Sequence, residues 1–217
     1  MSHGAGPNGQ FAVETASGRY VDLERPDPST IVLEDIAHHL ASTTRFAGAA
    51  RRPITVAEHT LLVADRLRQK RHPATFILAG LHHDDGEAYV GELTRPMKLL
   101  LAAAGATVAE VERRMLDAIW EALDLPVGIP YEIIKEADDW ALAAEAWHLL
   151  PSRGRGWVTD GLYHPDLSAP PAAARLRSEH GPSFDVLLTL WLEEHRRLSR
   201  AVEDRRSTMA AAAEAAR

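Results

Sequence analysis

The sequence contains no cysteine among its 217 residues. This absence excludes a disulfide scaffold, a thiol nucleophile and a thiolate metal site. No apolar run approaches the roughly 18 residues that a membrane span needs, and the first ten residues carry neither a basic start nor an apolar stretch. We therefore expect a cytoplasmic protein without signal peptide or membrane anchor, in which any metal is held by His, Asp and Glu.

Positive charge is also in short supply. The chain has 24 Lys and Arg against 31 Asp and Glu, which gives a formal net charge of −7. Because an acidic surface repels phosphate backbones, polymeric nucleic acid is not an expected partner. With 46% hydrophobic and 25% charged residues the composition is that of an ordinary globular protein. The length predicts one domain with appendages.

Apolar spacing divides the chain into four regions. Residues 1–30 form an N-terminal extension, in which alternating apolar residues around Ala16–Gly18 predict a short β-hairpin. Residues 31–150 form the core, residues 151–182 are a loop rich in Pro and Gly, and residues 183–217 form a C-terminal helix that packs on the same domain. The helices are expected over about 33–43, 55–70, 73–90, 107–125, 130–150 and 183–213.

Local signals support two of the predicted helix starts. Thr55 and Glu58 have the spacing of a capping box, and so do Thr107 and Glu110. Pro96 is expected to interrupt the chain between the third and fourth helices. The sequence therefore predicts an all-α helical bundle with a small N-terminal hairpin.

Three segments place metal-binding residue types among apolar residues. They contain His59, the tandem His82–Asp85 and Asp138, each on a different predicted helix. A buried His or Asp needs a hydrogen bond, an ion pair or a cation, and three helices of a bundle can converge on one point. Mixed nitrogen and oxygen ligands suit transition metals better than Ca²⁺. Such a centre can polarise a phosphoryl oxygen and acidify a bound water, so the ligand set indicates metal-assisted phosphate hydrolysis.

The residues around these ligands resemble a known family. Arg45–Phe46, the segments 55–59 (TVAEH) and 83–98 (HDDGEAYVGELTRPMK), and 135–138 (KEAD) are similar to HD-domain phosphohydrolases. The most similar branches are the 5′-deoxynucleotidase-like enzymes and phage-type enzymes that hydrolyse deoxynucleoside triphosphates. The resemblance covers about residues 17–150 and implies an HD-domain helical bundle with one divalent metal ion, such as Co, Mn, Zn, Fe or Mg.

The resemblance also implies the ligand set, which is His59, His83, Asp84 and Asp138. The tandem of two His and two Asp leaves the register open. We choose the inner pair because the family's acidic active-site residues then fall on Glu87 and Glu92. The outer pair, His82 and Asp85, is expected to support the ligands or to pack in the core.

Further roles follow from the resemblance alone. Glu87, with Asp84, is the expected catalytic group, which orients or deprotonates the attacking water or protonates the leaving group. Substrate-binding roles fall on Arg45, Phe46, Glu92, Lys98 and Lys135. Phosphate would contact the three cations and Phe46 would lie near the sugar or base, whereas Glu92 stands where relatives usually carry Asp. Solvated charges and a core aromatic are the structural alternatives for these side chains.

These observations leave three hypotheses. The leading one is a metal-dependent phosphohydrolase acting on a small (deoxy)nucleotide, either a monophosphate or a triphosphate. The second is a nucleotide-binding module without turnover. The third is an HD-type di-iron oxygenase, in which His82 and Asp85 supply extra ligands. The resemblance further implies a homo-oligomer, with the helix after Ser183 as a reasonable interface.

Overall fold

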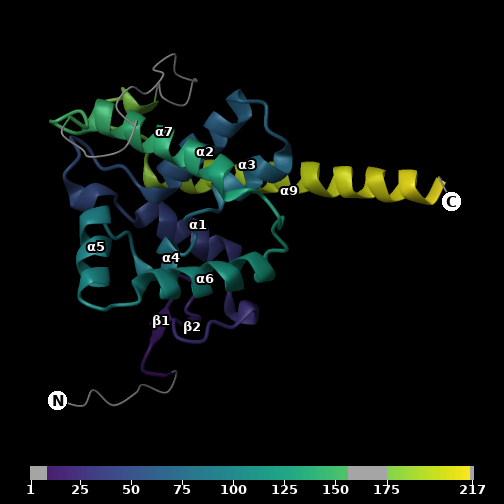
Figure 1. The fold of residues 1–217 in the computed structure, drawn as a ribbon, viewed down its shortest axis with the longest axis horizontal. Helices are drawn as coiled ribbons and strands as arrows, with labels where there is room; N and C mark the ends of the chain where they lie inside the picture. Colours follow the sequence, from purple (N-terminus) through teal and green to yellow (C-terminus); the bar gives the residue numbers. More distant parts are fainter. Residues whose placement is uncertain (1–8, 156–174, 216–217) are drawn as a thin grey trace.

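The computed structural model describes residues 9–155 and 175–215. It is mostly helical, with a small antiparallel sheet near the N-terminus (Figure 1). Strand β1 (Ala12–Glu14) pairs with β2 (Tyr20–Asp22), and Val13 lies opposite Val21. The connecting turn is closed by a hydrogen bond from Gly18 N to Thr15 O. The predicted hairpin is therefore confirmed.

The helices follow the sheet in chain order. Their bounds are η1 (Pro28–Thr30), α1 (Leu33–Ser42), η2 (Phe46–Gly48), α2 (Val56–Gln69), α3 (Ala74–Leu81), α4 (Glu87–Val90), α5 (Arg95–Ala103), α6 (Val108–Ala122), α7 (Tyr131–Leu149) and α9 (Phe184–Ala215). Of the predicted loop 151–182, residues 151–155 form turns and residues 156–174 lie outside the described part of the chain.

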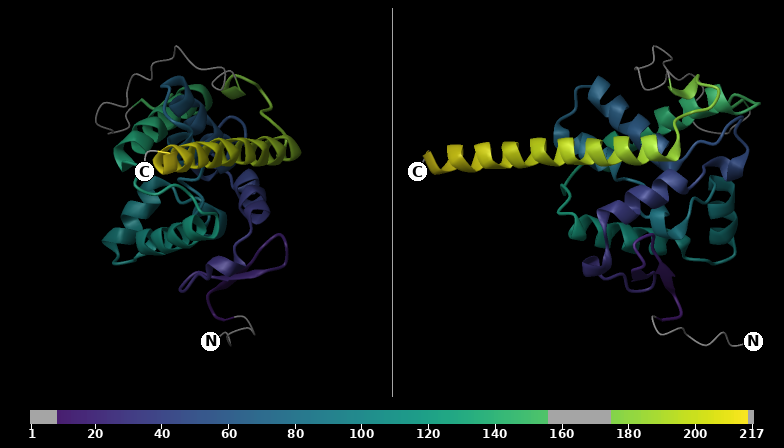
Figure 2. Two further views of the ribbon diagram at one scale, coloured as in Figure 1. Left: turned by 90° about the vertical axis from the view of Figure 1, so that its right-hand side faces the viewer. Right: turned by 180° about the vertical axis from the view of Figure 1, so that it is seen from behind.

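Helix α2 occupies the centre of the bundle. It packs against α3, α7, α1 and the first half of α9, and most of its side chains are buried. The first half of α9 buries Trp191, Leu198 and Val202, whereas every described side chain beyond Val202 is exposed. Figures 1 and 2 show this last part of α9 projecting from the body. Among the described helices, none is long and apolar enough to cross a membrane.

Of the two predicted capping boxes, the first forms one of its two hydrogen bonds and the second forms neither. The Thr55 hydroxyl accepts a hydrogen bond from the backbone N of Glu58, 3.3 Å away. The Glu58 carboxylate binds the buried guanidinium of Arg52 instead of returning to the cap, with N–O distances of 2.7 and 2.9 Å. Thr107 makes no side-chain cap at the start of α6, so the second predicted box is wrong.

The predicted helix over 73–90 is confirmed as far as Leu81 but is wrong in its continuity, because the chain turns after Leu81. His82 Nδ1 lies 2.5 Å from Asp85 Oδ2, and both side chains are fully buried. This contact closes a turn over 82–86, after which α4 begins at Glu87. Pro96 does not interrupt the chain as expected, since it lies in the first turn of α5, where its missing N–H costs no helical hydrogen bond.

Candidate metal centre

Three elements bring the four predicted ligands to one place. His59 lies on the second turn of α2, His83 and Asp84 lie in the turn after α3, and Asp138 lies on α7. His59 Nε2 is 3.1 Å from Asp138 Oδ1 and 3.6 Å from Asp84 Oδ2. His83 Nε2 is 3.3 Å from Asp84 Oδ2 and 3.8 Å from Asp138 Oδ1. Ligand atoms of His59, His83 and Asp138 all lie within 4.8 Å of one another, so this group could hold a metal ion.

The two imidazoles are oriented as ligands would be. His83 Nδ1 donates to the backbone oxygen of Gly80 at 2.9 Å, and His59 Nδ1 lies 2.6 Å from Glu145 Oε1. Both Nε2 atoms are buried and make no hydrogen bond of acceptable geometry. Two nitrogens that are withdrawn from water and face carboxylates form a donor set that fits a divalent transition metal.

Glu145 contacts the candidate site through His59 and Arg45, and sequence reasoning missed it. Its buried carboxylate binds His59 Nδ1 through Oε1 and accepts from Arg45 Nε through Oε2 at 3.1 Å. A carboxylate behind a ligating histidine fixes the ring and makes it a better ligand. The signal was present, because Glu145 follows Asp138 by seven residues and therefore shares its face of α7.

Charges around the centre shift the pKa values of its groups. Burial and Arg45 oppose the charged form of His59, but Glu145 and Asp138 raise the pKa of His59 to about 10. Burial raises the pKa of Asp138, yet the neighbouring imidazoles of His59 and His83 hold that pKa well below its ordinary value. In the absence of a metal ion, this cluster therefore favours positive charge at the histidines and negative charge at the carboxylate.

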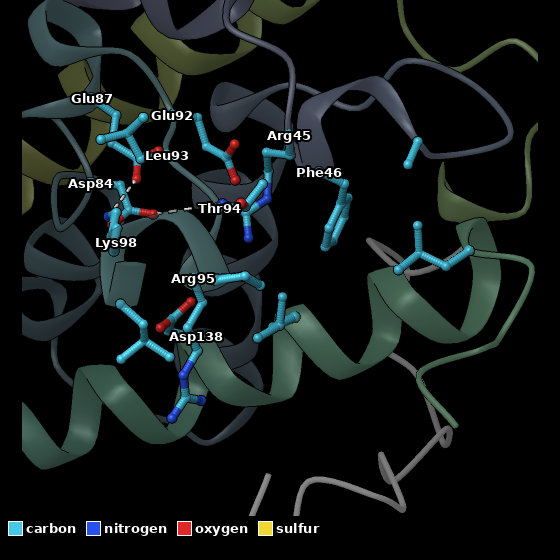
Figure 3. A pocket seen from close by; sticks show the side chains of 15 residues that line it. Arg45, Phe46, Asp84, Glu87, Glu92, Leu93, Thr94, Arg95, Lys98 and Asp138 are labelled. Atoms are coloured by element: carbon cyan, nitrogen blue, oxygen red, sulfur yellow. Dashed lines mark hydrogen bonds and ion pairs between the residues drawn. The ribbon is translucent and has the colours of Figure 1, made fainter. Parts of the chain in front are cut away.

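A cavity of about 660 Å³ opens beside the centre (Figure 3). Backbone hydrogen bonds between residues 43–45 and 54–56 place Arg45 next to the start of α2. The wall combines charged and apolar side chains from several elements. Its charged members are Arg45, Asp84, Glu87, Glu92, Arg95, Lys98 and Asp138, and its apolar members include Phe46, Leu93, Leu99, Leu142 and Leu150.

Glu87, which lines this cavity, is the first residue of α4. The sequence had placed it on a continuous helix over 73–90. Its Oε1 lies 3.3 Å from Lys98 Nζ, and its Oε2 is buried without a hydrogen-bond partner. Burial and the nearby Asp84 carboxylate raise the pKa of Glu87 to about 8, although Lys98 and Arg45 act in the opposite direction. The carboxyl group is thus placed to hold or release a proton beside the metal centre.

The three predicted phosphate-binding cations differ in position. Arg45 is buried and holds Glu145, with Nη1 3.8 Å from Asp84 Oδ2. Lys98 lines the cavity and binds Glu87 and also Glu112, at 3.0 Å. Lys135 is not among the described residues that line the cavity, because it pairs with Asp138 at 3.3 Å and with Asp139.

Phe46 and Glu92 both lie on the cavity wall, as their predicted roles require. The guanidinium carbon of Arg45 lies 5.5 Å from the centre of the Phe46 ring. Phe46 and Ala47 have φ values of 57° and 50°, a left-handed conformation that non-glycine residues rarely adopt. Glu92 Oε2 is buried without a hydrogen-bond partner. The backbone at Phe46 is therefore held in a costly conformation beside the cavity.

Two bacterial proteins are similar to this chain. The uncharacterized protein RCAP_rcc00048 of Rhodobacter capsulatus is 37% identical over 138 residues, which span 60% of this chain and 68% of that protein. The uncharacterized protein YfdR of Escherichia coli is 30% identical over 151 residues, which span 69% of this chain and 79% of that protein. The chain belongs to their family. No family model matches the sequence.

For this member of the family, the site itself has to indicate the chemistry. It combines the group His59, His83 and Asp138, with the Asp84 carboxylate close to both imidazoles, and a cavity that also contains cations and a buried carboxyl group. Metal ligands beside a proton-transferring group and anion-binding side chains form an arrangement suited to metal-assisted hydrolysis.

Proposed function

We propose that this chain is a divalent-metal-dependent phosphohydrolase of the HD-domain type that acts on small (deoxy)nucleotides. The observation that carries the proposal is the pair of buried Nε2 atoms of His59 and His83, which lack hydrogen-bond partners and face Asp84 and Asp138. This donor set adjoins a cavity large enough for a nucleotide-sized ligand.

The two histidine ligands have separate supports in the protein. Glu145 orients His59 and the Gly80 carbonyl orients His83, so both Nε2 atoms face the centre before any ion binds. When bound, a divalent ion would polarise a phosphoryl oxygen and acidify a coordinated water. Preorganised ligands reduce the conformational cost of capturing that ion.

Glu87 is proposed as the proton-transfer group. Hydrolysis forms a bond between a water oxygen and phosphorus and breaks the ester bond, so the leaving oxygen must gain a proton. Glu87 faces the cavity next to Asp84, with Oε2 unpartnered, and can deliver this proton to the leaving oxygen or remove one from the water. Lys98, 3.3 Å from Oε1, steadies the carboxylate form.

The charges favour a monophosphate over a triphosphate. The cavity wall includes the carboxylates of Asp84, Glu87, Glu92 and Asp138, and two of its three cations, Arg45 and Lys98 but not Arg95, bind acidic side chains in the salt bridges of the described residues. A triphosphate brings more negative charge and would need more free cations than this wall offers. With Lys135 turned to Asp138 and Asp139, the site suits a 5′-monophosphate.

The test is a phosphate-release assay. Purified protein is stripped of metal, reloaded with Mn, Co, Mg or Zn, and offered ribo- and deoxynucleoside mono- and triphosphates. We expect inorganic phosphate from a deoxynucleoside 5′-monophosphate, and at least a 100-fold loss of this activity in Asp84→Asn. Tripolyphosphate from a triphosphate would overturn the monophosphate assignment. Absence of hydrolysis with every metal would overturn the hydrolase.

The two alternatives predict different results. A binding module without turnover would bind nucleotide and release no phosphate. A di-iron oxygenase needs further ligands, but His82 and Asp85 bind each other and His82 also contacts His195, so neither points to the centre. Two tightly bound irons per chain would nevertheless favour that alternative.

A further inference from the structure

The outer pair of the tandem His82–Asp85 has a partner in the C-terminal helix. His82 Nδ1 lies 2.5 Å from Asp85 Oδ2, and His82 Nε2 lies 2.8 Å from His195 Nδ1 on α9. His82 and Asp85 are fully buried. Since the inner pair, His83 and Asp84, faces the metal centre, one short turn presents two residues to the centre and one, His82, to α9.

Trp191, one turn before His195, strengthens this contact. Its ring lies edge-on to His82 at 5.0 Å and parallel to the His195 ring at 6.2 Å. Its indole Nε1 donates to Thr60 Oγ1 at 3.0 Å, and Thr60 directly follows the ligand His59. Helix α9 therefore touches two of the three ligand-bearing elements, the 82–86 turn and α2.

We propose that His82, Asp85 and His195 are positioning residues, which hold the 82–86 turn so that His83 and Asp84 keep the geometry the metal ion requires. This inference rests on the metal centre of the proposed function. Helix α3 ends at Leu81, and the turn after it is held by short-range backbone hydrogen bonds, from Asp85 N to His82 O at 3.3 Å and from Glu87 N to Asp84 O at 2.9 Å. The hydrogen bond between His82 and His195 adds a restraint on this turn from α9.

Hydrogen-bond chemistry indicates which atom of His195 matters. An ionised carboxylate can only accept hydrogen bonds, so Asp85 accepts one from the Nδ1–H of His82. The Nε2 atom of His82 then accepts a hydrogen bond from the Nδ1–H of His195. In this arrangement His195 Nε2 accepts from the Ser199 hydroxyl, 3.3 Å away. Asn at position 195 carries an amide N–H close to the position of Nδ1 and can keep the donation, whereas Leu fills similar space and cannot.

The experiment measures cobalt binding by the full chain. Metal-stripped wild type, His195→Leu, His195→Asn and the control Arg196→Leu are titrated with Co²⁺ against a coloured chelator, and their visible spectra are recorded. Arg196 is the next residue of α9, faces solvent and lies 4.0 Å from Glu34. Far-UV circular dichroism and a thermal melt report on folding in the same samples.

We expect His195→Leu to weaken Co²⁺ binding at least tenfold, the lower end of the range for residues that support metal ligands, and to shift the visible bands. His195→Asn is expected to stay within about threefold of wild type and Arg196→Leu to match it. The proposal is overturned if His195→Leu binds Co²⁺ like wild type with an unchanged spectrum, even when its melting temperature falls. Should His195→Leu fail to fold, His195→Asn compared with His195→Gln, which lacks a donor at the Nδ1 position, makes the same distinction.

Failure of this inference differs from failure of the proposed function. Wild type that binds Co²⁺ but hydrolyses no nucleotide contradicts the hydrolase and leaves the positioning role to be decided by the variants. Wild type that binds no Co²⁺ contradicts the metal centre and the positioning role together.

Discussion

Glu145 links the metal centre to the cavity wall through two buried contacts, to His59 and to Arg45. Replacing it by Gln keeps the size of the side chain but removes the charge that both partners need. We expect Glu145→Gln to weaken divalent-metal binding by about 10- to 100-fold, the range reported for partners of ligating histidines. A chelator competition assay measures this change.

The matched control for this variant is Glu136→Gln. Glu136 lies on the same helix, is exposed and pairs with Lys70 at 3.5 Å. Metal affinity of Glu136→Gln should equal that of wild type. If Glu145→Gln binds the divalent metal as tightly as Glu136→Gln does, Glu145 does not support the metal centre.

Asp35 in α1 gives the fold a defined acid sensitivity. Its carboxylate accepts hydrogen bonds from the backbone N and the hydroxyl of Ser17, at 2.8 and 2.7 Å. Burial acts to raise the pKa of Asp35, but these bonds, Thr15 and His39 outweigh it, so the pKa falls below the ordinary 3.8. A lowered folded pKa contributes stability above pH 3.8, and this contribution is lost as the pH falls through the folded value.

We therefore expect Asp35→Asn to lower the free energy of unfolding at pH 7 and to flatten its decline below pH 4. Urea unfolding at pH 7, 4 and 3 measures both effects, with the exposed neighbour Glu34→Gln as control. A decline as steep as that of wild type would show that Asp35 is not the group responsible.

At the residue scale, the resemblance to HD-domain enzymes implied the four ligands but neither their supports nor the pairing of Lys135. The ligand types could be recognised because His and Asp among apolar residues need a partner. Glu145 was overlooked, although its seven-residue spacing from Asp138 was visible. The contacts of Lys135 with Asp138 and Asp139 depend on side-chain rotamers, which no sequence spacing specifies.

At the scale of elements, most helices were predictable because their apolar residues recur with helical spacing. The helix over 73–90 was not, because Leu81 to Val90 carries the same spacing while the buried pair His82–Asp85 bends the chain. The first box at Thr55 predicted the start of α2, yet Glu58 bound Arg52. Local patterns identify candidate caps, whereas distant partners decide which side chains use them.

The pair Arg52–Glu58 fastens the segment before α9 to α2. Both side chains are buried, and Arg52 also donates to the backbone oxygens of Arg175 and Ser178, at 3.1 and 3.2 Å. Arg52→Met leaves the Glu58 carboxylate buried and unpaired. We expect it to lower the free energy of unfolding by about 3–5 kcal/mol, the usual loss when one member of a buried ion pair is removed.

Urea unfolding measures this loss against Arg51→Met, a control in which an exposed neighbouring arginine changes. The double variant Arg52→Met/Glu58→Met should recover much of the lost free energy of unfolding, because no charge is then left buried. If the double variant is no more stable than Arg52→Met, the loss does not come from the unpaired carboxylate.

At the scale of the whole molecule, the structure divides into a packed body and a projecting helix end. Side chains of α9 beyond Val202 are exposed, and the pair formed by Arg206 with Asp124 lies at the surface. Ending the chain after Glu203 should therefore change the free energy of unfolding by less than about 1 kcal/mol, the usual limit for a surface ion pair.

Thermal unfolding and light scattering of the shortened chain measure its stability and mass together. A loss of several kcal/mol at unchanged mass would contradict the division into body and projection. A smaller number of chains per particle than in the wild type would identify the projecting end as the interface of the expected homo-oligomer.

The proposed function depends most on one divalent-metal centre built by His59, His83, Asp84 and Asp138. The direct measurement is the metal content of the purified full chain after reloading with Co²⁺ and removal of free ion, compared with Asp138→Asn. We predict one ion per chain in the wild type and a large loss in the variant at unchanged helical content. Equal metal content in the two proteins, or no retained ion in the wild type, would contradict the account.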